Sequence, residues 1–342
     1  MTDRQRLPID TLTGHVSAAP TPFAQGHIDE PAFVEFCRWQ VDSGIAALVV
    51  NGTTGEAPTL SAVEQSRTIV LAVKAVNGRV PVIAGAGSSE TAHAVELARR
   101  AERAGADGLL VVTPYYNRPP QEGIFRHFEA VHAATSIPIL LYDVPARTGV
   151  TLTADTLQRL AQLPRIVGFK DATGRPERAL HLRRQLGEAF RLFSGDDATA
   201  LDFMMKGGNG CISVLANVVP GECAKLDAAC RRGDYYGEAR TIGASLVPLV
   251  RALATEANPI PVKFALSLLG RMRPEMRLPL CEPAAATRIE VAEVLVRMGL
   301  LRQPSCEPAA QSRPWADDRG GRPPSCPDGR EAAWAPDRIK IA

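Results

Sequence analysis

Short apolar runs alternate with longer amphipathic stretches along most of this chain. The apolar runs, each a predicted strand, are residues 16–19, 46–50, 80–84, 108–112, 137–142, 166–169, 190–193 and 210–214. The stretches between them carry apolar residues at helical spacing, as in residues 62–76 and 92–104. Ser61 and Glu64 form the pattern of a capping box at the start of one such helix. The alternation predicts parallel strands joined by crossover helices.

The number of strand–helix units decides between two kinds of parallel sheet. Open doubly wound sheets have fewer strands and often a glycine-rich phosphate loop after the first, whereas here the first strand leads into AAPTPF. The expected fold class is therefore α/β, a (β/α)8 TIM barrel with a C-terminal helical appendage. The predicted division is an N-terminal extension (1–11), the barrel (12–219), a helical region (220–302) and a tail (303–342) whose composition predicts disorder.

Composition and charge exclude several classes of protein. The chain is 45% hydrophobic and 22% charged, which is ordinary for a globular protein. Its formal net charge of +2 gives little attraction to nucleic acid or anionic lipid. No apolar run approaches the ~20 residues of a membrane helix, and the first ten residues lack the apolar stretch of a signal peptide. We expect a cytoplasmic protein that binds neither nucleic acid nor membrane.

Cysteine and histidine give no sign of a disulfide framework or a metal site. The seven cysteines are an odd number without a CxxC pair, which favours free thiols in a reducing compartment. The six histidines form no HxxxH pattern and no cluster with cysteine. We expect no bound metal.

Lys170 is the strongest candidate for chemistry, because catalytic side chains of a parallel barrel collect where the strands end. Alternation along the strand places Ile166, Gly168 and Lys170 on one face, with Gly168 leaving room for the amine. Desolvation there would favour the neutral amine that attacks a carbonyl, although a lysine at a strand end can also reach out to water. The other lysines are predicted on amphipathic helices (74, 206, 225 and 263) or in the tail (340). If an amine reacts, Lys170 is the candidate.

Hydroxyl groups follow the neighbouring predicted strands. Tyr142 ends the strand before Lys170 and can carry protons, as imine chemistry requires. Thr53 or Thr54 and Tyr115 or Tyr116 are further hydroxyls at strand ends, although the threonines can equally cap a turn and the tyrosines can simply pack.

Two other strand-end sequences invite a functional interpretation. Gly52 and Gly55 leave backbone N–H groups that can bind a carboxylate, and GTTGE lacks the lysine of a nucleotide phosphate loop. Asp196 and Asp197 resemble a catalytic pair, but capping of the following helix is the favoured role.

Six motifs at strand ends together indicate a family. They are GTTGE (52–56), TPYYNRP (113–119), YDVPART (142–148), GFKDAT (168–173), SGDD (194–197) and GCISVLAN (210–217). With these motifs the chain resembles the dihydrodipicolinate synthase / N-acetylneuraminate lyase family of pyruvate-dependent class I aldolases over about residues 12–300.

The resemblance implies catalytic roles for four of these residues. Lys170 would form a Schiff base with pyruvate, so no cofactor is expected. Tyr142 would donate and accept protons, with Thr53 in the relay. Tyr116 would complete the relay by reaching across the interface of a tight dimer, which is expected to assemble further into a tetramer.

The resemblance also implies the substrate contacts. Thr54 and the backbone around Ile212 would hold the pyruvate carboxylate, and Gly195 would keep the pocket floor open. Arg147 would bind the carboxylate of a second substrate, because a guanidinium fork suits that geometry.

Arg147 favours the synthase branch, in which pyruvate condenses with L-aspartate-4-semialdehyde to 4-hydroxy-tetrahydrodipicolinate in lysine (diaminopimelate) biosynthesis. The alternatives are a related pyruvate aldolase or dehydratase acting on a sugar acid or other aldehyde, such as an N-acetylneuraminate lyase-like enzyme, and a barrel used only for binding. Asp143, Ala146 and Cys211 depart from the family's usual asparagine, glycine or serine, and valine. The first two flank Arg147 and therefore bear on the second substrate.

Many synthases of this family are inhibited by lysine, which binds polar and acidic side chains at the dimer interface. Here Ala57 and Ala62 offer no side-chain hydrogen bonds at the corresponding positions. His93 stands where an acidic partner for the effector's ammonium would be expected. We therefore predict weak or absent inhibition by lysine.

Overall fold

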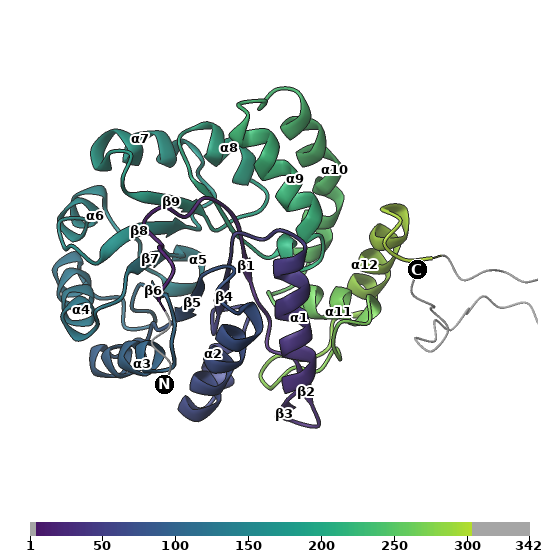
Figure 1. The fold of residues 1–342 in the computed structure, drawn as a ribbon, viewed down its shortest axis with the longest axis horizontal. Coiled ribbons are helices and arrows are strands. Elements are labelled where there is room, and N and C mark those ends of the chain that lie inside the picture. Colours follow the sequence, from purple (N-terminus) through teal and green to yellow (C-terminus); the bar gives the residue numbers. More distant parts are fainter. Residues whose placement is uncertain (1–4, 303–342) are drawn as a thin grey trace, which may run out of the picture.

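The computed structural model describes residues 5–302, and its centre is a closed barrel of eight parallel strands (Figure 1). The strands are β1 (Gly14–Ala18), β4 (Ala47–Val50), β5 (Val82–Gly85), β6 (Gly108–Val112), β7 (Ile139–Asp143), β8 (Ile166–Asp171), β9 (Arg191–Ser194) and β10 (Gly210–Ser213). Each pairs in parallel with its neighbours along the chain, and β10 pairs with β1 to close the barrel. The predicted (β/α)8 barrel is confirmed, and every predicted strand is present.

Helices surround the barrel on its outside (Figure 1). They are α1 (Glu30–Asp42), α2 (Ala62–Val76), α3 (Thr91–Arg103), α4 (Gln121–Ala134), the short α5 (Pro145–Thr148), α6 (Ala154–Leu160), α7 (Glu177–Leu186) and α8 (Ala200–Met205). Short 3-10 turns η1 (Ala57–Thr59) and η2 (Leu215–Asn217) follow β4 and β10, and a small hairpin, β2 (Phe23–Ala24) and β3 (His27–Ile28), follows β1. The capping box predicted at Ser61 and Glu64 is formed at the start of α2. Caps of this kind contribute about 1 kcal/mol each.

Two apolar cores result from the alternation of side chains along the strands. The outward core lies between the barrel and its helices and includes Leu48 and Phe169. The inward core fills the barrel with side chains such as Val16 and Phe193. Ile9, from the segment predicted as an N-terminal extension, is fully buried in this inward core. The segment before β1 therefore contributes to the interior of the barrel.

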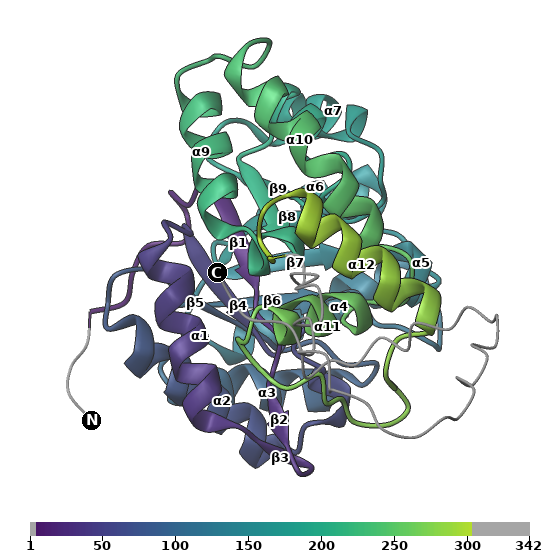
Figure 2. The ribbon, with the colours of Figure 1, turned by 90° about the vertical axis from the view of Figure 1, so that its right-hand side faces the viewer.

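Four helices form the C-terminal part: α9 (Pro220–Arg231), α10 (Glu238–Leu253), α11 (Ile260–Leu268) and α12 (Ala285–Arg297). α9 packs against β1 and so completes the ring of helices around the barrel. α10, α11 and α12 pack against one another on one side of the barrel (Figure 2). Across residues 5–302, no helix combines the length and the apolar character needed to cross a bilayer. The predicted disorder of residues 303–342 falls outside the described residues.

Candidate active site

Lys170 and Tyr142 lie side by side at the carboxyl ends of β8 and β7. The two residues are partners in the parallel register, and the Lys170 amine lies 4.4 Å from the centroid of the Tyr142 ring. Both side chains are buried, with 7% and 8% of their surface exposed. Within residues 5–302, the amine forms no hydrogen bond or ion pair. The site therefore holds a desolvated amine, free of a carboxylate partner, against a phenol ring.

The route by which β8 turns Lys170 inward differs from the simple alternation that we predicted. The register between β7 and β8 shifts at Ile139 and Leu140, which pair with Ile166 and Gly168. Ile166 consequently packs in the outward core, whereas Val167 packs against the inward core. The prediction that Ile166 shares the face of Lys170 was wrong, because this irregularity adds one residue to β8.

Room for the lysine is left by a different glycine from the one we expected. A Cβ atom on Gly168 would approach the Arg191 carbonyl oxygen to 2.6 Å, so Gly168 permits close contact between β8 and β9. A Cβ atom on Gly195 would lie 2.8 Å from Cε of Lys170. The Lys170 side chain therefore packs directly over Gly195, whereas a Cβ atom on Gly168 would first meet Arg191 and Leu140.

The loop after β4 is tightly folded around its two threonines. Asn51 and Glu56, at its ends, both have left-handed backbone angles (φ 55° and 54°), which non-glycine residues seldom adopt. The Asn51 side chain is held at both ends, because its amide donates to the Gln65 carbonyl and its oxygen accepts from the Thr68 hydroxyl. A Cβ atom on Gly85 would lie only 1.9 Å from the Asn51 carbonyl oxygen, so β5 must carry glycine there.

Within this loop, Thr54 is 2% exposed and Thr53 is half-buried. The Thr54 hydroxyl accepts a hydrogen bond of 2.9 Å from the side-chain amide of Asn258, which lies between α10 and α11. The structure therefore joins a predicted binding residue to the C-terminal helices.

The end of β10 is held by Asp197. One carboxylate oxygen accepts from the backbone N–H groups of Val214 and Leu215, both at 2.9 Å, and the other accepts from the Ser213 hydroxyl. Helix α8 has Thr199 as its N-cap and no side-chain capping bond. Capping by Asp197 was therefore a wrong prediction: this residue fixes the turn that follows the buried Ile212.

Arg147 lies exposed on α5, two residues after the proline that starts this helix. Its guanidinium donates to the backbone carbonyl of Asn258 at 3.3 Å. Asn258 thus contacts both Thr54 and Arg147, two residues predicted to bind different substrates.

A buried ionic cluster lies next to the catalytic strand ends. Asp143 and Asp171, register partners on β7 and β8, both accept from the Arg178 guanidinium, at 3.2 and 3.1 Å. Burial raises the pKa of Asp143 above its usual range, although hydrogen bonds from Thr151 and the charge of Arg178 oppose this shift. Asp143 Oδ1 has no hydrogen-bond partner among the described residues. Asp143, which stands where the family usually has asparagine, therefore lies against Arg178 beneath the site.

Tyr116 is placed differently from the other predicted catalytic residues. It has a left-handed backbone (φ 73°), and 92% of its surface is exposed. Among the residues that the structure describes, it makes no hydrogen bond to Lys170 or Tyr142. Tyr116 therefore lies apart from Lys170 and Tyr142 in its own chain.

A second lysine of the described chain is buried, although the sequence pattern did not predict it. Lys263 is fully buried on α11 and lies 2.6 Å from a carboxylate oxygen of Glu56. Placing it on an amphipathic face was wrong, because its neighbours Val262 and Phe264 are buried as well. The uniformly apolar character of 260–268 is the signal that could have revealed it.

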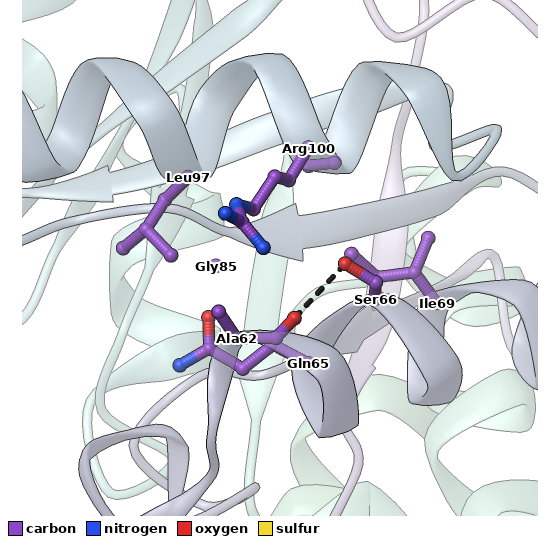
Figure 3. Close-up of a pocket in the computed structure, with 8 residues that line it drawn as sticks. Ala62, Gln65, Ser66, Ile69, Gly85, Leu97 and Arg100 are labelled. Atoms are coloured by element: carbon purple, nitrogen blue, oxygen red, sulfur yellow. Dashed lines mark hydrogen bonds between the residues drawn. The ribbon is translucent and has the colours of Figure 1, made fainter.

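A small pocket lies apart from these residues, between α2, β5 and α3 (Figure 3). Its lining includes Ala62, Gln65, Gly85 and Arg100, and none of the predicted catalytic residues. One of these, Ala62, is among the positions expected to form an effector site.

The relatives of the chain agree with this geometry. The model of the "Dihydrodipicolinate synthetase family" matches residues 11–298. The 4-hydroxy-tetrahydrodipicolinate synthase of Methylobacterium radiotolerans is 49% identical over 85% of this chain and 97% of its own length. The enzyme of the same name from Rhodospirillum centenum is 50% identical over 84% of this chain and 99% of its own.

Solved structures show the same likeness. The chloride-inhibited dihydrodipicolinate synthase of Acinetobacter baumannii, complexed with pyruvate, superposes with a TM-score of 0.82 and 40% identity, covering 84% of this chain and 99% of that one. The predicted family is confirmed, and the synthase function is supported over the sugar-acid alternative. With its barrel, its buried lysine and these relatives, the chain belongs to the dihydrodipicolinate synthetase family.

Proposed function

We propose that this enzyme condenses pyruvate with L-aspartate-4-semialdehyde to form 4-hydroxy-tetrahydrodipicolinate, the reaction for which its relatives are named. The observation that carries the proposal is the buried Lys170 amine beside the Tyr142 phenol, with no acid to neutralise it among residues 5–302. An amine at this position can reach a carbonyl carbon at the barrel mouth and attack it as a nucleophile.

The reaction can be followed atom by atom from this arrangement. The Lys170 nitrogen adds to the C2 carbonyl of pyruvate, and loss of water leaves an imine. Removal of a methyl proton gives an enamine, whose carbon attacks the aldehyde carbon of the second substrate while the developing alkoxide takes up a proton. The amino group of that substrate then displaces Lys170 from the imine carbon, which closes the ring and frees the enzyme. The protein itself supplies the electrophilic imine, so no cofactor is needed.

Tyr142 is the proposed proton carrier, because its ring lies against the reacting amine. Thr53 stands in the loop after β4 and is proposed as the next hydroxyl of the relay. Tyr116, exposed on a strained backbone, is proposed to complete the relay in the site of a partner subunit. This role requires a homodimer, and we propose further assembly into a tetramer.

The substrate contacts follow from the loops around the amine. The Thr54 hydroxyl and the backbone at Ile212 are proposed to bind the pyruvate carboxylate, at a turn that Asp197 holds in place. Gly195 is proposed to keep the pocket floor clear, because a Cβ atom there would lie 2.8 Å from Cε of Lys170. Arg147, exposed at the rim, is proposed to bind the carboxylate of the aldehyde substrate.

Borohydride reduction in the presence of pyruvate tests the proposal. A stable adduct is expected on Lys170 and on no other lysine, as mapped by peptide mass spectrometry. The exposed Lys225 and the buried Lys263 serve as internal controls in the same digest. An adduct elsewhere, or none, would overturn the mechanism. A screen of aldehyde acceptors then separates the synthase from the sugar-acid alternative, because only the synthase should turn over aspartate semialdehyde in preference to sugar-derived aldehydes.

A further inference from the structure

The segment that begins α11 contacts the loop after β4 at two points, although the two lie far apart in the sequence. Asn258 donates to the Thr54 hydroxyl at 2.9 Å, and Lys263 pairs with Glu56 at 2.6 Å. The two loop residues are separated only by Gly55, so both contacts hold the same turn of the loop. The C-terminal helices thus hold the part of the barrel mouth that carries Thr53 and Thr54.

The Lys263–Glu56 contact is a complete buried network. Both side chains are fully buried, and the Lys263 amine also donates to the Thr21 carbonyl at 2.9 Å. The second Glu56 oxygen accepts from the backbone N–H of Arg277 at 3.1 Å. The Thr21 hydroxyl in turn donates to the Gly55 carbonyl at 2.7 Å. This network holds the left-handed backbone of Glu56, a conformation that would otherwise relax.

Asn258 acts on this fixed loop through a directional bond. Because the Asn258 amide is the donor, the Thr54 hydroxyl uses one of its lone pairs and keeps its own proton for another acceptor. That proton can then be donated to a carboxylate. The backbone carbonyl of the same Asn258 accepts from Arg147 at 3.3 Å.

We propose that Asn258 is a positioning residue that aims the Thr54 hydroxyl proton at the pyruvate carboxylate. This inference rests on the proposed function, since it assigns the carboxylate of pyruvate as the acceptor. It makes the C-terminal helical region part of the substrate site, because one of its side chains sets the hydrogen-bond direction of a barrel residue.

Four variants test the proposal: Asn258→Ala, Asn258→Asp, Thr54→Val and the double variant Thr54→Val/Asn258→Ala. Asn258→Ala removes one neutral hydrogen bond, so KM for pyruvate should rise about five- to tenfold. KM for the aldehyde and kcat should change less than about twofold, because the backbone carbonyl that meets Arg147 is retained. In Asn258→Asp a carboxylate accepts the Thr54 proton and repels pyruvate, so KM for pyruvate should rise more than in Asn258→Ala.

The double variant distinguishes positioning from a general structural effect. With valine at position 54 there is no hydroxyl to orient, so adding Asn258→Ala should change KM for pyruvate less than about twofold. Ser267→Ala is the matched control and should behave as the wild type, because Ser267 lies on the adjacent α11 and its hydroxyl donates to the Phe264 carbonyl of that helix. Equal effects of Asn258→Ala in both backgrounds, or a parallel loss of kcat and of both KM values, would overturn the proposal.

The concentration dependence of borohydride trapping gives a second readout that does not depend on the aldehyde. Half-maximal trapping at Lys170 should need about five- to tenfold more pyruvate in Asn258→Ala than in the wild type. Trapping of the variant at wild-type pyruvate concentrations overturns the positioning role and leaves the proposed function intact. A wild type that does not trap pyruvate overturns both. The near-isosteric Asn258→Asp provides the same measurement if Asn258→Ala does not fold.

Discussion

Two lysines of the described chain are buried, one at the barrel mouth and one where the C-terminal helices meet the loop after β4. Lys170 is 7% exposed, faces a phenol ring and packs over Gly195. Lys263 is fully buried and is held by the Glu56 carboxylate and the Thr21 carbonyl. Burial alone therefore does not mark a nucleophile; the hydrogen-bond and ion-pair partners of the amine do.

The acids near Lys170 show how the difference is maintained. Asp143 and Asp171 follow Tyr142 and Lys170 directly in sequence, yet alternation turns them to the other face of the strands, where both bind Arg178. The carboxylates closest in sequence are thus occupied by an arginine, and the amine is left without a counter-ion. Lys263, in contrast, has the Glu56 carboxylate as its partner. Burial lowers the pKa of Lys263, and the charge of Glu56 opposes that shift.

The largest expected effect comes from exchanging the reactive amine itself. Lys170→Met should abolish turnover and borohydride trapping, because no other described lysine offers an unpaired buried amine. Its free energy of unfolding should equal or exceed that of the wild type, since a buried amine without an acid partner is removed. Steady-state assays and chemical denaturation check both halves. Retained turnover would show that Lys170 is not the nucleophile, and a large loss of stability would show that its amine has a stabilising partner.

Tyr142→Phe should keep pyruvate binding but lower kcat by ~10²–10⁴, the usual contribution of a positioned general acid or base. The ring that lies 4.4 Å from the Lys170 amine remains, so the packing of the amine is preserved. Single-turnover kinetics after pyruvate trapping separate the two steps. Tyr236→Phe, at a tyrosine that is 77% exposed, is the control and should match the wild type.

Lys263→Met should affect stability where Lys170→Met does not. Removing one partner leaves Glu56 buried without its counter-charge, which costs ~3–5 kcal/mol of unfolding free energy. The double variant Glu56→Gln/Lys263→Met should recover part of that loss, because no buried charge is stranded. Denaturant titration measures both, with the exposed Lys225→Met as the matched control. Equal stability of the single variant and the wild type would mean that the Lys263–Glu56 pair does not contribute to stability.

Asp143→Asn tests the ionic cluster beneath the site through the pH dependence of stability. The pKa of Asp143 is raised in the folded state, so the folded protein binds more protons than the unfolded chain above the ordinary carboxyl pKa. Its contribution to stability therefore falls as pH rises through that window, by about 1.4 kcal/mol for each unit of the shift. The asparagine variant should lack this decline, so its free energy of unfolding relative to the wild type should increase between acidic and neutral pH. Parallel curves would show that Asp143 does not titrate there.

The barrel and most of the site were predictable because they depend on local patterns. Alternating strands, helical spacing and capping residues act within a few positions, and the six motifs place Lys170, Tyr142 and Gly195 at strand ends. The irregularity at Ile166 was not predictable, because one added residue in a strand leaves no periodic signal.

Contacts between distant parts of the chain were also beyond prediction. Asp197 bonds the turn after β10, and Asn258 bonds Thr54, through partners that only folding brings together. Lys263 was misplaced because helical spacing indicates which face is apolar but not how deeply the whole helix is buried.

The smallest expected effect concerns free L-lysine as an inhibitor. Its ammonium group, like the two buried amines, can be judged by the carboxylate partners that the protein offers. An ammonium bound by the protein needs a carboxylate, as Lys263 needs Glu56. In the region of the expected effector site, Gln65 donates to the Ala57 carbonyl at 3.0 Å, and the exposed His93 lies 3.4 Å from the Ser88 hydroxyl. Of the two nearest acids, Glu90 and Glu96, Glu96 is already bonded to Arg100 at 2.7 Å.

We therefore predict that lysine inhibits weakly or not at all, because at least one charge-assisted contact of ~1.5–3 kcal/mol is missing. Titration of L-lysine into the condensation assay measures this directly, and strong inhibition below millimolar lysine would show that other side chains bind the ammonium. His93→Glu is the sharper test. It places a carboxylate where the effector's ammonium would lie, and should lower the lysine concentration for half-inhibition by about tenfold or more, whereas the neutral His93→Gln should not. If both substitutions leave lysine without effect, then the missing acid is not what prevents lysine from binding, and the apolar Ala57 and Ala62 become the next positions to exchange.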